Sequence, residues 1–234
     1  MKPDALLFDV FGTVVDWRES IATHVTAAFA QKGLDIDGPA FADAWRALYQ
    51  PSMERVRCGE RPYHPLDDLH RENLLRALSD SGNAGVFEPD EIIKLAEAWE
   101  RLDPWPDVRD GLARMRRNYV LAPCSNGSIA LMTRLARYAG LPWDCILGAD
   151  IARAYKPDPR VYGASCAALR LAPERVMMVA AHNDDLAAAR ASGLRTAFVV
   201  RRDEHGPGQA TDQTATQDWD VVVEDFGALA TALS

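Results

Sequence analysis

The chain has 234 residues, 48% of them hydrophobic and 26% charged, proportions typical of a globular protein with one large domain or a large and a small one. Its formal net charge of −8 argues against a nucleic-acid-binding surface, because such a surface needs clustered basic residues to meet phosphate. No apolar stretch is long enough to cross a bilayer and the N-terminus does not resemble a signal peptide, so no membrane association is predicted.

The cysteines are predicted to be reduced thiols in a cytoplasmic protein. They are widely spaced and form no Cys-x-x-Cys pair, which disfavours both a zinc site and a disulfide framework. The basic pairs Arg116-Arg117 and Arg201-Arg202 are interpreted as solvated helix and loop charges. The four cysteines are Cys58, Cys124, Cys145 and Cys166.

In chain order, the first predicted element is a buried strand that ends in a candidate nucleophile. Residues 5–8 are apolar without interruption, as in a central parallel strand that is covered on both faces. Asp9 follows directly, and Gly12 allows a tight turn whose backbone N–H groups can face an anion. Because aspartates after strands are often structural, this segment alone does not decide whether Asp9 is catalytic.

From about residue 19 to residue 102 the pattern is helical. Apolar residues recur at helical spacing in four groups, and turn-rich pieces separate the groups. The prolines at 104 and 106 then hinder helix continuation and suit a hinge. The segment is therefore predicted to be a helical insert. The four groups are Ile21, Val25, Ala28 and Phe29; Phe41, Trp45, Leu48 and Tyr49; Leu66, Leu69, Leu74 and Leu78; and Ile92, Ile93, Ala96 and Trp99.

After the hinge, helices and strands alternate. This alternation predicts a parallel sheet with helices on both faces, and ligands of such sheets bind beyond the carboxyl ends of the strands. Residues 204–218, rich in Gly, Pro, Gln and Thr, are predicted to form an exposed loop. The predicted helices are 108–117, 128–138, 158–169 and 184–192; the predicted strands are 119–124, 145–147, 176–179 and 196–200; and a last strand and helix lie within 220–233.

A second polar segment, Ser125-Asn126-Gly127-Ser128, stands at a strand end and a helix start. Ser125 or Ser128 as a plain N-cap is one interpretation. The other is that the Ser125 hydroxyl, the Asn126 amide and the helix N-terminus together bind an anion. The residues of this segment alone leave both interpretations open.

The third segment contains Lys156, followed by a helix start. Asp158 as the N-cap and Pro159 as the first helical residue have a structural explanation. Lys156 is not explained in that way. It is either a solvated lysine or a lysine beside a nucleophilic carboxylate, which it would keep ionised and oriented.

The fourth segment is His182-Asn183-Asp184-Asp185, which follows another predicted strand. One of its acids could cap the next helix while the other reaches into a crevice. Asp9, Ser125 and Asp185 all come just after strands. Because the carboxyl ends of parallel strands meet at one edge of a sheet, one crevice could collect all three.

With these segments in this order, the chain resembles the haloacid dehalogenase superfamily, and most closely its L-2-haloacid dehalogenase branch. The motifs FDVFGT, SNG, YKPDP and NDD have the spacing expected of that family along essentially the full length. The resemblance implies a Rossmann-like α/β core over residues 1–14 and 103–234, with a helical cap domain over residues 15–102. It also suggests a homodimer.

Two departures from the phosphatases of that superfamily decide the expected activity. Phosphatases carry an aspartate where this chain has Phe11, and it protonates an alkoxide leaving group; a departing halide needs no proton. They also bind Mg²⁺ through an aspartate where this chain has Ala181. We therefore expect a dehalogenase that uses no metal and no cofactor. The alternatives are a Mg²⁺-dependent phosphatase acting on a small phosphometabolite and a non-catalytic binding protein.

The resemblance also implies a mechanism for short (S)-2-haloacids. Asp9 would displace the halogen, and water would cleave the resulting aspartyl ester to give an (R)-2-hydroxyacid. Lys156 would keep Asp9 ionised, and Thr13 at the end of the first motif would join the catalytic set. Asp185, with His182 or Asn183, would direct the water.

The same resemblance suggests how the substrate is held. Arg46, which follows Trp45, and Asn126 would assist the halide, while Ser125 and nearby backbone N–H groups would bind the substrate carboxylate. Arg18 competes with Arg46 for one role. Tyr162 matches a family tyrosine or only packs, and His182 is either a water-positioning group or a neutral core histidine. Phe11 and Trp17 are further candidates for the pocket wall.

Overall fold

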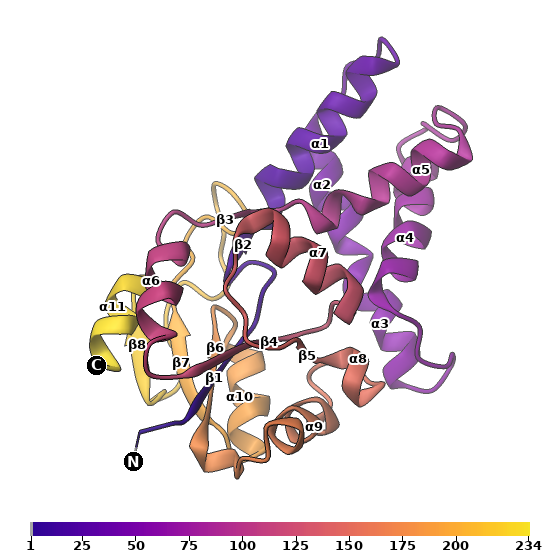
Figure 1. The fold of residues 1–234 in the computed structure, drawn as a ribbon. Helices are drawn as coiled ribbons and strands as arrows, with labels where there is room; N and C mark the ends of the chain where they lie inside the picture. Colours follow the sequence, from indigo (N-terminus) through magenta and orange to yellow (C-terminus); the bar gives the residue numbers. More distant parts are fainter. Residues whose placement is uncertain (1) are drawn as a thin grey trace.

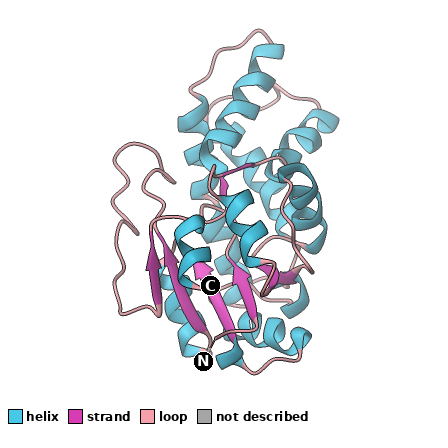
Figure 2. Cartoon of the chain, turned by 60° about the vertical axis from the view of Figure 1, so that its left-hand side comes forward, coloured by secondary structure: helices cyan, strands magenta, loops and turns pink. Residues whose placement is uncertain are grey.

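Six parallel strands, in the order β5-β4-β1-β6-β7-β8, form the sheet at the centre of the fold (Figure 1). The structure is a computed structural model and describes residues 2–234. Helices lie on both faces of the sheet, which confirms the α/β architecture predicted from the sequence (Figure 2). The strands are β1 (Ala5–Phe8), β4 (Val120–Ser125), β5 (Leu147–Gly148), β6 (Val176–Ala180), β7 (Arg195–Val199) and β8 (Val221–Val223).

The central strand β1 is buried on both faces, which explains its uninterrupted apolar sequence. Successive side chains of a strand point to opposite faces. Leu6 and Phe8 accordingly join the cluster that contains α6, α7 and α11, while Ala5 and Leu7 join the cluster that contains α9 and α10. The core helices are α6 (Val108–Met115), α7 (Ile129–Ala139), α8 (Ala149–Ala152), α9 (Pro159–Leu169), α10 (Asn183–Ala191) and α11 (Phe226–Ala232), with the short 3-10 helix η2 (Pro173–Arg175).

Between β1 and β4 the chain forms a group of helices that stands to one side of the sheet (Figure 1). A short antiparallel pair, β2 (Val15–Asp16) with β3 (Asp103–Pro104), joins the entry and the exit of this group. The helical periodicity of this segment is confirmed, whereas the β2–β3 pair was not predicted. The helices are α1 (Trp17–Gln31), α2 (Gly38–Ala47), α3 (Tyr49–Arg57), α4 (Leu66–Asp80), α5 (Pro89–Ala96) and the 3-10 helix η1 (Glu97–Glu100).

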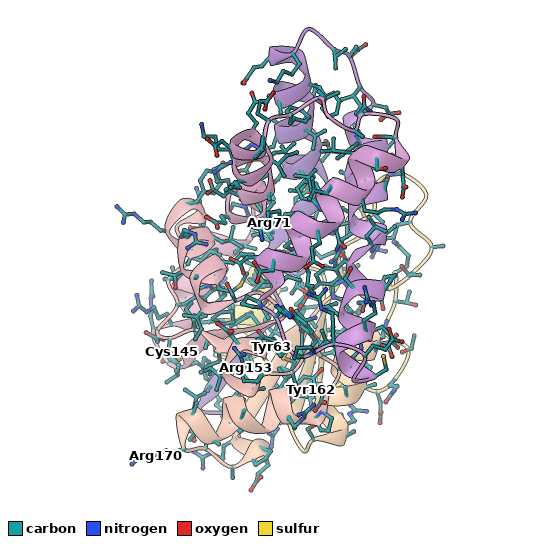
Figure 3. The ribbon with its side chains drawn as sticks, turned by 90° about the vertical axis from the view of Figure 1, so that its right-hand side faces the viewer. Tyr63, Arg71, Cys145, Arg153, Tyr162 and Arg170 are labelled. Atoms are coloured by element: carbon teal, nitrogen blue, oxygen red, sulfur yellow. The ribbon has the colours of Figure 1, made fainter. Side chains whose placement is uncertain are left out.

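Polar contacts also join the helical group to the core on the side of α8. The Tyr63 hydroxyl donates to Oδ1 of Asp150 at 3.2 Å, and the Arg153 guanidinium lies 4.5 Å from the centre of the Tyr63 ring (Figure 3). The Tyr155 hydroxyl donates to the carbonyl oxygen of His64 at 2.6 Å. None of the helices within residues 2–234 combines the length and apolar character that a membrane-spanning segment requires.

One prediction about the chain after β7 is wrong, and a second holds except at the start of the loop. Arg201 is not solvated: it is 8% exposed, donates to the carbonyl oxygen of Thr13 at 2.9 Å and pairs with Asp107 at 2.9 Å. Residues 204–218 form the predicted loop and are mostly exposed or half-buried, but Glu204 at its start is only 1% exposed. Both side chains turn inward because buried partners far away in the sequence offer them hydrogen bonds, and such partners cannot be read from local composition.

Candidate active site

A cavity of about 750 Å³ lies at the carboxyl ends of the central strands, between the sheet and the helical group. The core lines it with Asp9, Lys156 and Asp185, and the helical group lines it with Arg46 and Tyr49. This is the edge of the sheet where parallel α/β folds bind ligands. The structure therefore brings together all four motif segments and one face of the inserted helices.

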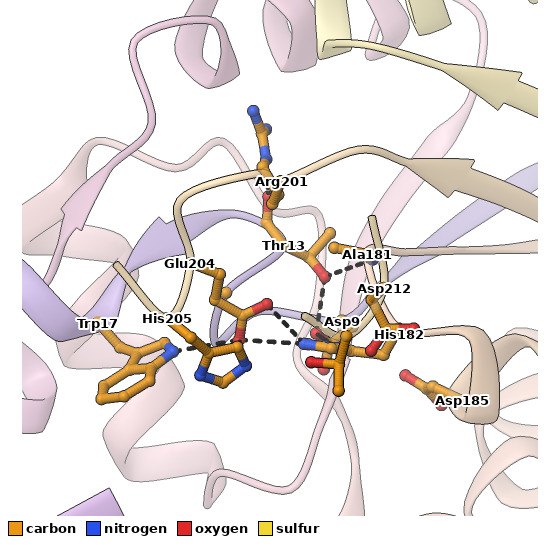
Figure 4. Close-up of polar contacts among 12 residues, drawn as sticks. Asp9, Thr13, Trp17, Ala181, His182, Asp185, Arg201, Glu204, His205 and Asp212 are labelled. Carbon is orange, nitrogen blue, oxygen red and sulfur yellow. Dashed lines mark hydrogen bonds and ion pairs between the residues drawn. The ribbon is translucent and has the colours of Figure 1, made fainter. Parts of the chain in front are cut away.

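Asp9 follows β1 and receives hydrogen bonds on both carboxylate oxygens. Its Oδ2 accepts from the Thr13 hydroxyl at 2.7 Å, and Nδ1 of His182 lies 3.1 Å from the same oxygen (Figure 4). Its Oδ1 accepts from Nζ of Lys156 at 2.8 Å. The Thr13 hydroxyl in turn accepts from the backbone N–H of Ala181 at 2.9 Å. The carboxylate is thus held in one orientation from both sides.

The electrostatics of the site keep Asp9 negative and Lys156 positive. Burial alone would raise the pKa of Asp9, but the charge of Lys156 and the hydrogen bond from His182 bring that pKa well below its ordinary value. Burial would likewise lower the pKa of Lys156, but the charges of Asp185 and Asp9 raise it above its ordinary value. Asp9 is therefore an ionised, oriented carboxylate near neutral pH, as a carboxylate nucleophile must be.

Asp185 stands on the other side of Lys156. Its Oδ2 accepts from Nζ of Lys156, and its Oδ1 accepts from the Tyr162 hydroxyl at 2.5 Å. Burial and the charge of Asp9 raise the pKa of Asp185, against the opposing effect of Lys156. Tyr162 itself is fully buried and does not line the cavity, so it acts on the site only through Asp185.

The second motif holds the segment around Lys156. The side-chain oxygen of Asn126, which lines the cavity, accepts from the backbone N–H of Lys156 at 2.8 Å. Ser125 is fully buried, lies outside the cavity lining, and accepts from the backbone N–H of Gly127 at 3.1 Å. Ser128 is the N-cap of α7 and accepts from the backbone N–H of Leu131 at 2.9 Å.

Of the two competing arginines, the structure brings Arg46 to the cavity. Its guanidinium lies 3.9 Å from the centre of the Tyr49 ring and 5.3 Å from that of Trp17. Its buried Nη1 has no hydrogen-bond partner among residues 2–234. Arg18 instead pairs with Asp43, with Nε and Nη2 each 2.8 Å from a carboxylate oxygen, and does not line the cavity. Arg46 is thus the guanidinium that is available to a ligand.

Aromatic rings form the apolar wall of the cavity. Phe11 is 2% exposed and meets Tyr49 and Trp99 edge to face, with ring centres 6.4 Å and 5.6 Å apart. Trp17 also lines the cavity, and its indole Nε1 donates to Oε1 of Glu204 at 3.1 Å. These rings exclude water from one side of the carboxylates and strengthen electrostatic interactions there.

Glu204 also belongs to this site, although the sequence did not predict it. Its Oε2 lies 2.9 Å from Nε2 of His182, so the imidazole stands between Glu204 and Asp9 (Figure 4). Burial would lower the pKa of His182, but Glu204 and Asp9 raise it well above its ordinary value, so His182 is not a neutral core histidine. One signal could have revealed Glu204: it follows shortly after β7, at the same edge of the sheet as the predicted residues.

Asn183 and the end of the β7–β8 loop form a supporting layer. The Asn183 side-chain N–H₂ donates to Asp212 at 2.7 Å and to the carbonyl oxygen of Thr214 at 3.0 Å. Its side-chain oxygen accepts from the Trp219 indole at 2.9 Å. Asn183 does not line the cavity, whereas Asp212 does. Asn183 therefore holds the loop that closes this side of the site.

The donors at this site do not fit the magnesium site of the phosphatases. Ala181, at the position of their additional aspartate, offers no side-chain oxygen. Nowhere in residues 2–234 do three His, Cys, Asp or Glu side chains gather as a metal ion would require. Magnesium prefers near-ideal octahedral oxygen coordination, and the ammonium of Lys156 already pairs with one oxygen of Asp9 and one of Asp185.

Comparisons with known proteins agree with this geometry. A sequence model of the haloacid dehalogenase-like hydrolases matches residues 3–193. The crystal structure of the defluorinating L-2-haloacid dehalogenase Rha0230 is similar, with 48% identity and a TM-score of 0.97 over 99% of this chain and 95% of that one. That of the L-2-haloacid dehalogenase PA0810 has 45% identity and a TM-score of 0.95 over 99% and 98%. The (S)-2-haloacid dehalogenase of Xanthobacter autotrophicus is 29% identical over 201 residues, 84% of this chain and 75% of that protein.

Proposed function

Because this chain belongs to the haloacid dehalogenase-like hydrolase family, we propose that it hydrolyses the carbon–halogen bond of short (S)-2-haloacids. The products are an (R)-2-hydroxyacid and a halide ion. Similarity at 48% and 45% identity to two L-2-haloacid dehalogenases, over 99% of this chain, supports this activity. The observation that carries it is the ionised Asp9 carboxylate, which shares one cavity with Arg46, whose buried Nη1 has no hydrogen-bond partner among residues 2–234.

In the first step, Asp9 attacks the carbon that bears the halogen and inverts it, forming an aspartyl ester. A carboxylate is a weak nucleophile in water, so orientation and exclusion of water must supply much of the rate. Thr13 and Lys156 supply the orientation. The departing halide takes a position beside Arg46, with Asn126 as its second partner.

In the second step, water cleaves the ester at the carbonyl carbon of Asp9. We assign the direction of this water to Asp185, which Lys156 and Tyr162 hold in place. The substrate carboxylate is assigned to backbone N–H groups of the loop around Asn126, which lines the cavity. The buried Ser125 hydroxyl fixes the shape of that loop by accepting a hydrogen bond from the backbone N–H of Gly127. No metal or cofactor takes part in either step.

The wider organisation belongs to the same proposal. Residues 1–14 and 103–234 act as the catalytic core, and residues 15–102 act as a cap that carries Arg46 over the nucleophile. Two observations support this arrangement: Arg57 donates to the carbonyl oxygen of Lys156 at 3.0 Å, and Arg46 lines the same cavity as Asp9. We also propose a cytoplasmic location, in keeping with the four free cysteines, and a homodimer.

A magnesium-dependent phosphatase is not favoured. Phe11 is an apolar, buried ring and supplies no proton to an alkoxide leaving group. Ala181 supplies no ligand to magnesium, and its backbone N–H is already bonded to Thr13. Both features suit a reaction in which a halide departs from carbon.

The test is halide release from EDTA-treated protein. We expect chloride release from L-2-chloropropionate, no effect of added Mg²⁺, and no release by the Asp9→Ala variant. A panel of chloro-, bromo- and fluoroacids then defines the halogen and the chain length that are accepted, and D-2-chloropropionate serves as the stereochemical control. Release from none of these acids, or Mg²⁺-dependent hydrolysis of phosphate esters instead, would contradict the proposal.

A further inference from the structure

The two carboxylate oxygens of Asp9 have different surroundings. Oδ2 accepts from the Thr13 hydroxyl at 2.7 Å and lies 3.1 Å from Nδ1 of His182. Among residues 2–234, Oδ1 has a single such partner, Lys156, at 2.8 Å. An oxygen whose lone pairs already meet two donors is the poorer nucleophile, so Oδ1 is the atom that attacks carbon. Oδ2 then becomes the carbonyl oxygen of the ester.

We propose that Thr13 and a protonated His182 form the oxyanion hole for hydrolysis of that ester, and that Glu204 is the positioning residue that aims His182 and keeps it charged. This inference rests on the function proposed above. Oxyanion-hole donors lie 2.7–3.1 Å from the atom on which negative charge develops. The distances of 2.7 Å from Thr13 and 3.1 Å from His182 to Oδ2 fall within that range.

Both donors are fixed before any substrate arrives. The Thr13 hydroxyl accepts from the backbone N–H of Ala181, which leaves its own hydrogen for Oδ2 of Asp9. Glu204 occupies Nε2 of His182, which leaves the Nδ1 hydrogen for the same oxygen. Donors that are already oriented cost no reorganisation when charge develops in the transition state.

Glu204 is itself held in a tight place. It is 1% exposed and accepts from the Trp17 indole at 3.1 Å. Its carboxylate lies so close to the Gly12 backbone that a Cβ built on Gly12 would be 2.0 Å from Oε1. A carboxylate this deeply buried requires a cationic partner. Nε2 of His182 lies 2.9 Å from Oε2 of Glu204, closer than Nε2 of His205, which lies 3.7 Å from Oε1.

The charge of His182 must survive the first step, and Glu204 provides for that. In the free enzyme, Asp9 and Glu204 both favour the imidazolium, and they raise the pKa of His182 against the effect of burial. Esterification removes the charge of Asp9. The negative charge of Glu204 is then what keeps the imidazole of His182 protonated. The other charged or titratable groups that line the cavity are Asp43 and Arg46 from α2, Tyr49 from α3, Lys156 from the segment before α9, Asp184 and Asp185 from α10, and His205 and Asp212 from the β7–β8 loop.

The hydrolytic step balances with these groups. The water oxygen adds to Cγ of Asp9 and passes one proton to Asp185, while the carbonyl electron pair moves onto Oδ2, where Thr13 and His182 stabilise it. When that pair returns, the bond from Cγ to Oδ1 breaks, and the hydroxyacid departs with Oδ1 and the proton from Asp185. The second water proton goes to solvent as Asp9 becomes a carboxylate again.

The competing role for His182 is that of a general base, and it requires a neutral imidazole. A base would have to accept a proton from water at Nδ1, yet Nδ1 faces Oδ2 of Asp9. The two roles predict opposite pH dependences. A charged donor loses its effect when pH rises through its pKa, whereas a base gains effect over the same range.

The first experiment separates the two chemical steps in His182→Ala, His182→Asn and Glu204→Gln. Halide release is followed in a single turnover, and the ester is followed by the intact mass of the protein. We expect one halide per active site in every variant, followed by accumulation of the ester. Hydrolysis slows by about 10² to 10³-fold in His182→Ala, the usual effect of losing one oxyanion donor. His182→Asn retains a neutral N–H at a similar position and loses less.

The second experiment measures ester hydrolysis against pH. We expect the wild-type rate to fall as pH rises through the His182 pKa, the fall to move to lower pH in Glu204→Gln, and no such fall in His182→Asn. Asp203→Asn is the matched control, because it removes one exposed negative charge from the same loop and leaves the profile unchanged. Melting curves verify that each variant is folded.

Each contrary result is distinct. Ester hydrolysis that increases with pH through the His182 titration would make His182 a base and overturn the inference. An unchanged rate of ester hydrolysis in folded His182→Ala would also overturn the inference. So would the absence of single-turnover halide release in that variant. Absence of halide release from the wild-type protein would instead overturn the proposed function, and the inference with it.

Discussion

Lys156 is the residue on which the charge balance of the site depends. Its ammonium lies between the carboxylates of Asp9 and Asp185, and all three side chains are at most 10% exposed. An isolated charge is costly to bury, so each carboxylate requires this cation in order to remain ionised. The same residue therefore serves stability and reactivity.

Replacing Lys156 by Met should test both roles. The variant leaves two buried carboxylates facing each other, and loss of a buried partner typically costs about 3–5 kcal/mol. The lowered pKa of Asp9 stabilises the wild-type fold above pH 3.8, and this contribution disappears only as pH falls through the still lower folded pKa. In the variant the carboxyl pKa values rise instead. Urea unfolding should therefore show a large difference in the free energy of unfolding between wild type and Lys156→Met at pH 7. This difference should become smaller as the pH falls toward about 4.

The control for this prediction is Lys94→Met. Lys94 is an exposed lysine of α5, so the substitution removes one positive charge without uncovering a buried carboxylate. We expect a change within about 0.5 kcal/mol. Halide release should vanish in Lys156→Met and persist in Lys94→Met. Equal stability losses in the two variants would contradict the role assigned to Lys156.

At the scale of elements, the turn after β1 and the loop after β7 meet at Gly12. Gly12 has a positive φ of 89°, and the Glu204 carboxylate occupies the space where a side chain would project. The turn thus serves two purposes: it presents Asp9, and it leaves room for the partner of His182. Neither purpose is visible in a single segment of the sequence.

Gly12→Ala and Gly33→Ala form a matched pair of variants that isolates the contact between Gly12 and the Glu204 carboxylate. Gly33 also has a positive φ, 70°, but nothing lies within 4 Å of a Cβ built there. An alanine in the left-handed region costs about 1–2 kcal/mol by itself, and Gly33→Ala should show that loss alone. Gly12→Ala should be destabilised further, and its ester hydrolysis should slow because Glu204 is displaced. Equal urea midpoints and unchanged hydrolysis would contradict the contact.

The elements also show what could be predicted from the sequence. Segments with a clear apolar pattern were predicted close to their observed bounds. For example, β6 (Val176–Ala180) was predicted as 176–179. The β2–β3 pair escaped prediction because two-residue strands have no measurable periodicity. Asp9 and Lys156 were predicted as site residues because their motifs, taken together, resemble those of a known family, although each motif alone left their roles open. Glu204 was not, because its inward orientation depends on His182 and Trp17, which other segments supply.

At the scale of the molecule, one hydrophobic cluster extends from the sheet into the inserted helices. It contains Leu6 and Phe8 of β1 together with Phe41 of α2, Leu69 of α4 and Trp99 of η1. Two parts that share one apolar cluster cannot separate without exposing it to water. The helical group and the sheet are therefore coupled in stability.

We expect the helical group and the sheet to unfold in one transition. Hydrogen exchange in increasing urea should show amides of α4 and of β6 losing protection at the same midpoint, because neither part keeps its apolar cluster alone. Coincidence of far-ultraviolet circular dichroism with tryptophan fluorescence provides the control. Loss of α4 protection at lower urea than β6 would instead indicate that the inserted helices unfold as an independent unit.

The crowding of Gly12 against Glu204 has a consequence for ancestry. A larger residue at position 12 would displace the acid at position 204 from its place beside His182. We therefore expect the two sites to be inherited as a pair, although most of the chain separates them. Among descendants of a common ancestor, we expect the two substitutions to occur together, with a change at position 182 as the third member.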